Sequence, residues 1–330
     1  GTYKVFAAPS ASAYSKFLKN LKTYCVEELK EVFENLVKYM YDNLEGFGEY
    51  LAIDGKAVQS YATNYSKETK EDGRRDTDAN WGTKKYTTSV NSKGEVVTNK
   101  VTWFGYTVHL VVDAKYELPV AFKVTPASNS EQMEAKEILK AMHEEQLEKC
   151  KYFMADKGYD DTKIIEYLKG KEIAAIIDIR NMWKDGEGTK QYKDTDVVYT
   201  YDGKVYYIDE NENQIKLRYL GYDKSSDSLR YGFKPQYNDN RVFRIKCDTD
   251  KRIFVNVARD SKKWAREYKK RTSVERVNGR IDRDYEFEDH TIRGIKKMDL
   301  YVTASFIVLL SMAKSKIEAN NYNHLAALIS

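Results

Sequence analysis

The sequence contains few of the residues that build disulfide frameworks or zinc sites. Its 330 residues include three cysteines and four histidines. The cysteines, Cys25, Cys150 and Cys247, lie far apart without a C-x-x-C spacing, and their odd number argues against a set of disulfides. We therefore expect a reducing, cytosolic setting. Because sulfur and imidazole ligands are scarce, any catalytic metal is expected to be a hard cation, Mg²⁺ or Mn²⁺, held by carboxylates.

Long hydrophobic runs are also missing. The longest apolar stretch, near residues 301–312, is shorter than the roughly 20 residues that span a bilayer. No N-terminal segment combines a basic start with an apolar run. We therefore expect a soluble protein with no membrane partner. The chain begins with Gly1 in place of methionine, which leaves open that an upstream domain is missing.

A large excess of charge of one sign is absent, because 55 Lys and Arg stand against 51 Asp and Glu. The net charge of +4 points only weakly to a polyanionic partner. The distribution is more informative, since the segment from Arg259 to Arg283 holds ten Lys or Arg against four Asp or Glu, with Trp264 and Tyr268 among them. Such a segment is typical of a surface that follows DNA phosphates and stacks on bases. The alternative is an ordinary solvated helix face.

The order of apolar segments predicts an α/β fold of the RNase H-like type, a mixed sheet flanked by helices. A buried strand at residues 50–55 carries Asp54 at its carboxyl end, and the polar segment 56–100 is expected to be a functional or partly disordered loop. The other predicted elements are two helices within 12–43, strands at 101–112 and 118–125, a helix at 128–147 that opens with a Ser128 and Glu131 capping box, a strand at 151–156, a helix at 161–169 and a strand at 172–178.

Beyond residue 180 the pattern changes to short alternating segments, which predicts a β-rich insertion before the last helices. Asp202-Gly203 lies between two such segments and is typical of a hairpin turn. Residues 261–284 and 298–317 then have helical spacing. The predicted domain division is a helical segment at 1–45, the first part of the core at 46–180, the insertion at 181–257, and helices that complete the core at 258–330.

Two carboxylates end apolar strands in the predicted sheet. Asp54 follows Ala52-Ile53, and Asp156 follows Met154-Ala155. Ligands of α/β sheets gather outside the carboxyl ends of the strands, so these side chains converge if the strands are adjacent. Two carboxylates a few ångströms apart repel each other strongly, and a divalent cation between them removes that repulsion. The alternative is that each aspartate is a turn residue or a helix cap.

A third acidic residue lies in the basic segment. Tyr268, Arg271 and Glu275 are spaced by three and four residues, which places them on one face of the predicted helix. Arg271 is suited to steady Glu275 or to contact a phosphate, and Glu275 is suited to complete a metal site. The alternative is a surface ion pair between the arginine and the glutamate.

These blocks resemble insertion-sequence DDE transposases that carry a Y-R-E-K signature, over about residues 49–314. The resemblance implies a DNA transposase that cleaves strands at the ends of a mobile element and transfers them. It implies that Asp54, Asp156 and Glu275 are catalytic and hold two Mg²⁺ or Mn²⁺ ions per active site. The implied partners are double-stranded DNA, at element ends and target, and further copies of the chain in a dimeric or larger synaptic complex.

The resemblance also implies a location in the bacterial cytosol or nucleoid and an N-terminal DNA-binding region, of which residues 12–43 would be the tail. One position departs from the signature, because Asp282 stands where the family has lysine. Arg280 or Arg283 is close enough in sequence to supply that charge. The full set that we predict to contact DNA is Lys56, Lys157, Tyr268, Lys270, Arg271, Arg280 and Arg283. For Lys56 and Lys157 the alternative is plain surface charge.

Other candidate residues have simpler structural explanations. Asp178 also ends a strand, and we expect it to pair with Arg180. His109 has apolar neighbours and is expected in the core, and Trp183 is expected to serve packing. Two other functions stay open from the sequence alone: a domesticated, non-catalytic DNA-binding protein, and an RNase H-like nuclease that cleaves without strand transfer.

Overall fold

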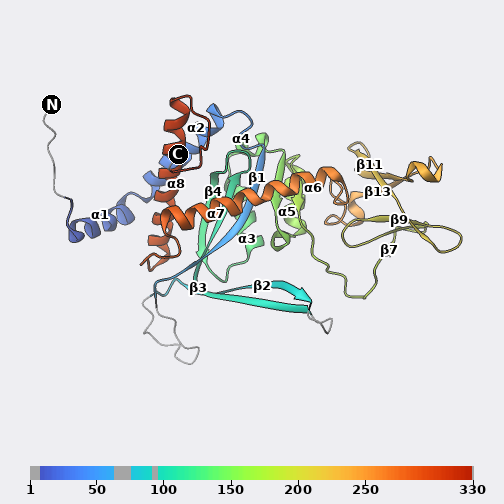
Figure 1. Ribbon diagram of the computed structural model, residues 1–330, viewed down its shortest axis with the longest axis horizontal. Helices are drawn as coiled ribbons and strands as arrows, with labels where there is room; N and C mark the ends of the chain where they lie inside the picture. The colour runs from blue at the N-terminus through green and yellow to red at the C-terminus, as the bar shows by residue number, and fades with distance from the viewer. Residues whose placement is uncertain (1–7, 63–75, 91–95, 329–330) are drawn as a thin grey trace.

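The structure is a computed structural model of the chain (Figure 1), and it describes residues 8–62, 76–90 and 96–328, with the backbone alone at 85–90 and 96–99. Its main sheet has the strand order β2-β3-β1-β5-β6, and β4 pairs with β3. The strands are β1 (Tyr50–Gln59), β2 (Asn80–Val90), β3 (Val96–Asp113), β4 (Leu118–Pro126), β5 (Tyr152–Ala155) and β6 (Ala174–Ile177). β1, β5 and β6 are parallel, whereas β3 is antiparallel to its partners.

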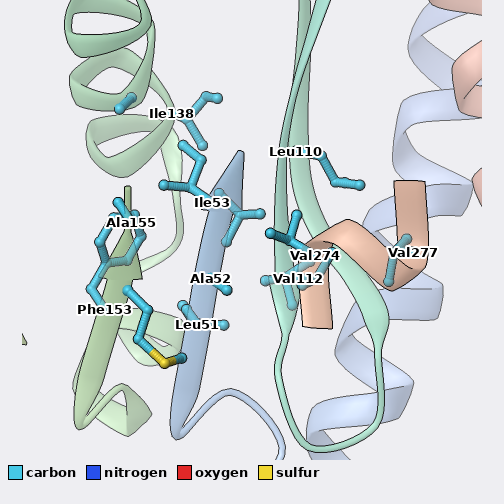
Figure 2. Close-up of a cluster of buried hydrophobic side chains, with 14 of the residues drawn as sticks. Leu51, Ala52, Ile53, Leu110, Val112, Ile138, Phe153, Ala155, Val274 and Val277 are labelled. Carbon is cyan, nitrogen blue, oxygen red and sulfur yellow. The ribbon is translucent and has the colours of Figure 1, made fainter. Parts of the chain in front are cut away.

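The central strand β1 is buried on both faces, as strands covered by helices on each side usually are. Leu51, Ala52 and Ile53 are fully buried in the main core. Figure 2 shows them among buried side chains of β3, β5 and two helices, including Ile138 of α3 (Glu131–Ala141) and Val274 of α7 (Thr272–Tyr285). The apolar run that predicted this strand therefore supplies the centre of the core.

Helices from the middle and from the C-terminal part of the chain pack on the sheet. α3 contacts β3 and β4, α7 contacts β1 and β3, and α6 contacts β5 and β6. α6 comprises Lys262–Tyr268. The remaining helices are α1 (Ala11–Tyr24), α2 (Val26–Asn43), α4 (Glu144–Lys149), α5 (Thr162–Gly170) and α8 (Ile295–Glu318). The predicted RNase H-like α/β class, with a mixed sheet flanked by helices, is confirmed.

Three local predictions are wrong. β1 does not end after Asp54 but continues to Gln59, and β2 with the start of β3 occupies part of the segment predicted as a loop; residues 63–75 and 91–95 of that segment lie outside the described residues. The predicted capping box is absent as well. The N-cap of α3 is Ser130, and Ser128 Oγ instead accepts a hydrogen bond from Asn80 Nδ2. Glu131 is thereby left free of a capping role.

The β-rich insertion predicted between the sheet and the last helices is present, with two small sheets and a separate apolar core. The hairpin at Asp202-Gly203 is confirmed, since β8 and β9 pair there and Gly203 has a φ of +82°. The strands are β7 (Lys190–Gln191), β8 (Val197–Tyr199), β9 (Val205–Ile208), β10 (Gln214–Lys216), β11 (Arg218–Asp223), β12 (Ser228–Gly232) and β13 (Val242–Lys246). The exact domain division stays a prediction.

α8 is the longest apolar helix. Among the described residues it is the one helix long and apolar enough to cross a membrane, by length and composition alone. It packs against α2 and β4, and Val302, Phe306 and Leu310 are fully buried in the main core. The contacts are those of a core helix. All three cysteines are free, as the sequence predicted.

A buried ion pair ties the insertion to the main sheet. Asp160 follows the short turn after β5, and its side chain has no exposed surface. It accepts hydrogen bonds from Arg252 Nε at 3.1 Å, from Arg252 Nη2 at 2.5 Å and from the Arg180 backbone N–H at 2.9 Å. Arg259 adds hydrogen bonds to the carbonyl oxygens of Ile177 and Arg252. These contacts fix where the chain re-enters the core.

Replacement of Arg252 by methionine is expected to lower the free energy of unfolding by about 3–5 kcal/mol, because it leaves the Asp160 carboxylate buried without its partner. Chemical denaturation of the purified chain measures the change. Glu172→Gln is the control, since Glu172 forms an exposed pair with Lys224 and such pairs contribute about 1 kcal/mol at most. Equal effects of the two substitutions would contradict the anchoring role.

Candidate active site

The register of β1 and β5 brings the two predicted aspartates together. The strands pair as Leu51↔Phe153 and Ala52↔Met154, and the same one-for-one step puts Asp54 level with Asp156. β5 ends at Ala155, so β1 has no strand neighbour on that side beyond this level. The two carboxylates therefore lie next to each other where the sheet opens.

Asp54 is held by two hydrogen bonds from different elements. Its Oδ1 accepts from the Gly55 backbone N–H at 2.8 Å, and its Oδ2 accepts from Asn278 Nδ2 of α7 at 3.4 Å. Burial raises the pKa of Asp54 to about 6, against an opposing effect of Lys84; the neighbouring Asp156 and Glu131 carboxylates raise it further, and the Gly55 N–H lowers it. Lys84 and the Gly55 N–H thus do not fully offset burial and the neighbouring carboxylates at Asp54.

Asp156 begins the 3₁₀ turn η1 (Lys157–Tyr159) after β5. Its Oδ1 accepts from the Gly158 backbone N–H at 2.7 Å, so the alternative that it caps a turn is also satisfied. The cap and a ligand role are compatible because Oδ2 remains. Asp178, directly after β6, stands level with Asp156, since Ala155 pairs with Ile177. The predicted pair of Asp178 with Arg180 is wrong, because Arg180 binds Asp160 instead.

α7 carries the third acidic residue along β1. Glu275 lies one helical turn before Asn278, the residue that reaches Asp54. Arg271 Nη2 donates to Glu275 Oε1 at 2.7 Å, and half of the Glu275 side chain is exposed. Glu275 is thus turned to Arg271 here. Among the described residues, no three His, Cys, Asp or Glu side chains are grouped closely enough to hold a metal ion.

The residue at the signature lysine position has a partner that the sequence did not predict. Asp282 pairs with Lys56 of β1. Lys56 and Asp54 are two residues apart on the strand and so face the same side, toward α7. Arg280 pairs with Glu117, and Arg283 pairs with Asp284. The cation that pairs with Asp282 is thus Lys56 of the strand, and the hypothesis that Arg280 or Arg283 supplies the charge of the signature lysine stays a prediction.

The other residues predicted to contact DNA differ in exposure. Lys157 is exposed beside Asp156, whereas Lys270 pairs with Glu267 and its Nζ lies 3.3 Å from the centre of the Tyr50 ring. Tyr268 is partly buried and stacks on Trp264, with 4.6 Å between the ring centres. Lys157 is the most accessible of these groups.

Two residues predicted to be structural are so. His109 is fully buried, its Nε2 lies 3.0 Å from Thr125 Oγ1, and burial lowers its pKa to about 4. It is therefore neutral at physiological pH. Trp183 packs edge-on against Tyr199 and Tyr201.

Three residues of the site were missed by the sequence analysis. Asn278 was findable, because it lies three residues after Glu275 on the same helix face. Glu131 was assigned to a capping box, and Lys84 lay in the predicted loop. In the structure Lys84 Nζ lies 2.9 Å from Glu131 Oε1 and donates to the Gly55 carbonyl oxygen at 2.8 Å. Only folding brings these segments together.

The donor set suits a hard divalent cation. Every acidic group at the site offers carboxylate oxygens, which Mg²⁺ and Mn²⁺ prefer. Two buried polar atoms beside the aspartates, Asn278 Oδ1 and Tyr159 Oη, have no hydrogen-bond partner among the described residues. Buried polar atoms normally have one. The residues therefore fit a hydrated cation at this position.

Fold and acidic residues together define the class of RNase H-like domains. The family model described as a transposase DDE domain matches residues 49–311, most of the chain. The chain therefore belongs to the transposase DDE domain family, and its function is of the transposase type. A search of curated proteins finds no match.

Asp54→Asn is expected to stabilise the metal-free protein by up to about 3 kcal/mol above pH 6, because the pKa of Asp54 is raised from 3.8 to about 6. Between these two values the folded state holds a proton that the unfolded state has lost. The stability of the parent therefore falls as pH rises through this window, and that of the variant does not.

Thermal or chemical unfolding across this pH range measures the difference. Below pH 3.8 the two proteins should be equally stable. Asp248→Asn, at an exposed carboxylate, is the control and should show no such gain. A variant that is less stable than the parent at every pH would contradict the electrostatic argument.

Proposed function

We propose that the chain is a DNA transposase that catalyses metal-dependent strand cleavage and strand transfer at the ends of a mobile element. The observation that carries the proposal is the β1–β5 register, which puts Asp54 level with Asp156 while α7 packs on the same strand. Membership of the transposase DDE domain family supports it. In this proposal Tyr268, Arg271 and Glu275 are the Y-R-E part of the signature, with Asp282 in place of its lysine.

Asp54, Asp156 and Glu275 would hold the catalytic cations, Mg²⁺ or Mn²⁺, two per active site. When bound, such ions activate an oxygen nucleophile and stabilise the leaving oxygen of a phosphodiester. The chain itself orients the ligands. Gly55 N–H and Asn278 Nδ2 fix the Asp54 carboxylate, and Arg271 binds the Glu275 carboxylate one helical turn before Asn278. A cation that attracts Glu275 must compete with this arginine.

The DNA surface proposed here combines an exposed lysine beside the site with the basic helix. Lys157 lies next to Asp156 and is free to meet a phosphate, and Arg271 has donors beyond the one that binds Glu275. Lys56, Lys270, Arg280 and Arg283 all pair with carboxylates, so they contribute more to position than to binding strength. Partners are element-end and target DNA and further copies of the chain, in the bacterial cytosol.

Asp156→Ala and Glu275→Ala are each expected to lower Mg²⁺-dependent nicking of DNA that carries the element ends by at least about a hundredfold, since each removes a charged group that stabilises the transition state. Gel assays of nicked and joined products measure both reactions. Asp178→Ala is the matched control, because Asp178 ends the neighbouring strand at the same level.

The product pattern separates the proposal from its rivals. Joined products that use a 3′-hydroxyl donor support strand transfer. Cleavage without joining would instead indicate a nuclease. DNA binding without cleavage, with equal behaviour of the parent and the Glu275→Ala chain, would indicate a non-catalytic binding protein.

Lys157→Ala is expected to weaken DNA binding similarly for all sequences and to reduce the slope of log affinity against log salt by about one, because one phosphate contact is lost. Fluorescence anisotropy at several salt concentrations measures the slope. Lys224→Ala, at an exposed residue of the insertion, is the control. An unchanged slope in the Lys157 variant would remove this residue from the DNA surface.

A further inference from the structure

The side chain of Glu131, in the first turn of α3, lies between Gly55 of β1 and Gly158 in the turn after β5. A Cβ atom placed on Gly158 would lie 2.6 Å from Glu131 Oε2 and 2.8 Å from Asp156 Oδ1, and one placed on Gly55 would lie 2.9 Å from Glu131 Oε1. These distances are too short for a real Cβ atom. Glycine at both positions therefore leaves room for the carboxylate, and Glu131 touches the chain directly beside each aspartate.

Lys84 of β2 brings a positive charge to this point. Its Nζ contacts Glu131 Oε1 and the Gly55 carbonyl oxygen, at 2.9 and 2.8 Å. Both side chains of the pair are about three-quarters buried, with 26% and 25% of their surfaces exposed. The β2–β3 ribbon extends below the rest of the sheet in Figure 1, so Lys84 reaches Glu131 and Gly55 from the edge strand of the sheet. An ammonium group and a divalent cation are alternative ways to balance the same carboxylates.

The hydroxyl group of Tyr159 is a second, independent indication of a ligand. Tyr159 is fully buried, and its Oη has no hydrogen-bond partner within the described part of the chain. The position that a Cβ atom of Gly55 would take lies 3.5 Å from Tyr159 Oη and 2.9 Å from Glu131 Oε1, so both oxygens border the same space. Because a buried hydroxyl group normally has a partner, the space before it suits a polar occupant such as water held by a cation.

From these contacts we infer that Glu131 is a fourth carboxylate of the divalent-cation site, and that Lys84 holds it when no metal is bound. The inference rests on the proposed function, because it concerns the same cations. Gly55 faces α3, whereas Asp54 faces α7. Glu131 therefore approaches Asp156 from the face of β1 opposite to Glu275. Acidic groups then lie on both sides of the opening beyond β5.

Mn²⁺ binding to the full chain without DNA tests the inference. Calorimetry and the electron paramagnetic resonance signal of free Mn²⁺ measure the affinity at neutral pH. Glu131→Gln is expected to weaken binding about tenfold or more, the range found when groups that support a metal site are removed. Lys84→Met is expected to strengthen binding several-fold, because it removes the competing ammonium group and keeps the length of the side chain.

Two substitutions nearby are matched controls. Glu137→Gln lies on α3 at an exposed position, and Lys123→Met removes the lysine of the Lys123–Glu134 pair. Both should bind Mn²⁺ as the parent does. Circular dichroism and the thermal unfolding midpoint show that each variant is folded, and Glu131→Asp replaces Glu131→Gln if that variant fails to fold.

The variant Asp156→Ala separates failure of the inference from failure of the proposed function. If Asp156→Ala abolishes Mn²⁺ binding while Glu131→Gln binds as the parent does, Glu131 is no ligand and the inference is overturned, whereas the proposed site stands. Lys84→Met with unchanged or weaker affinity also overturns it. If Asp156→Ala binds Mn²⁺ as tightly as the parent, the cation site itself is wrong and both proposals fall.

Discussion

The parallel pairing of β1 with β5 is the constraint on which the rest of the site depends. Backbone hydrogen bonds fix the register at Leu51↔Phe153 and Ala52↔Met154. Asp54 lies two residues after Ala52, and Asp156 lies two residues after Met154. The register therefore forces Asp54 and Asp156 to the same level. The apolar residues that stabilise this pairing lie in the main core, so the fold holds the two charges together despite their repulsion.

The surroundings of the aspartates reduce that repulsion without removing it. Asn278 and the Gly55 N–H bind Asp54, Arg271 binds Glu275, and Lys84 lies at Glu131. The raised pKa of Asp54 shows that these groups do not fully offset burial and the neighbouring carboxylates. The Asp54 carboxylate is therefore less stable in the folded protein than in the unfolded chain, and this difference lowers the stability of the protein above the raised pKa.

α7 packs along β1 and carries several of the candidate residues. Arg271, which occupies its N-cap position, and its residues Glu275, Asn278 and Asp282 follow at spacings of four, three and four, so they form one stripe along the helix. Asn278 contacts Asp54, and Asp282 contacts Lys56. Asp54 and Lys56 are two residues apart, so they lie on the same face of β1. The positive charge beside Asp282 comes from Lys56 of the strand.

The sequence by itself determined the RNase H-like class, the central apolar strand, the β-rich insertion and the residues Asp54, Asp156 and Glu275 as a candidate set. These features depend on short-range patterns, because apolar spacing and helical offsets are local properties. Predictions that paired a residue with a near neighbour in the sequence failed: the capping box of Ser128 with Glu131 and the pairing of Asp178 with Arg180. Ser128, Glu131 and Arg180 instead have partners in more distant segments. Only the tertiary structure decided that Lys84 meets Glu131 and that Lys56 meets Asp282, because side-chain ion pairs between distant strands and helices follow from packing, which no local pattern specifies.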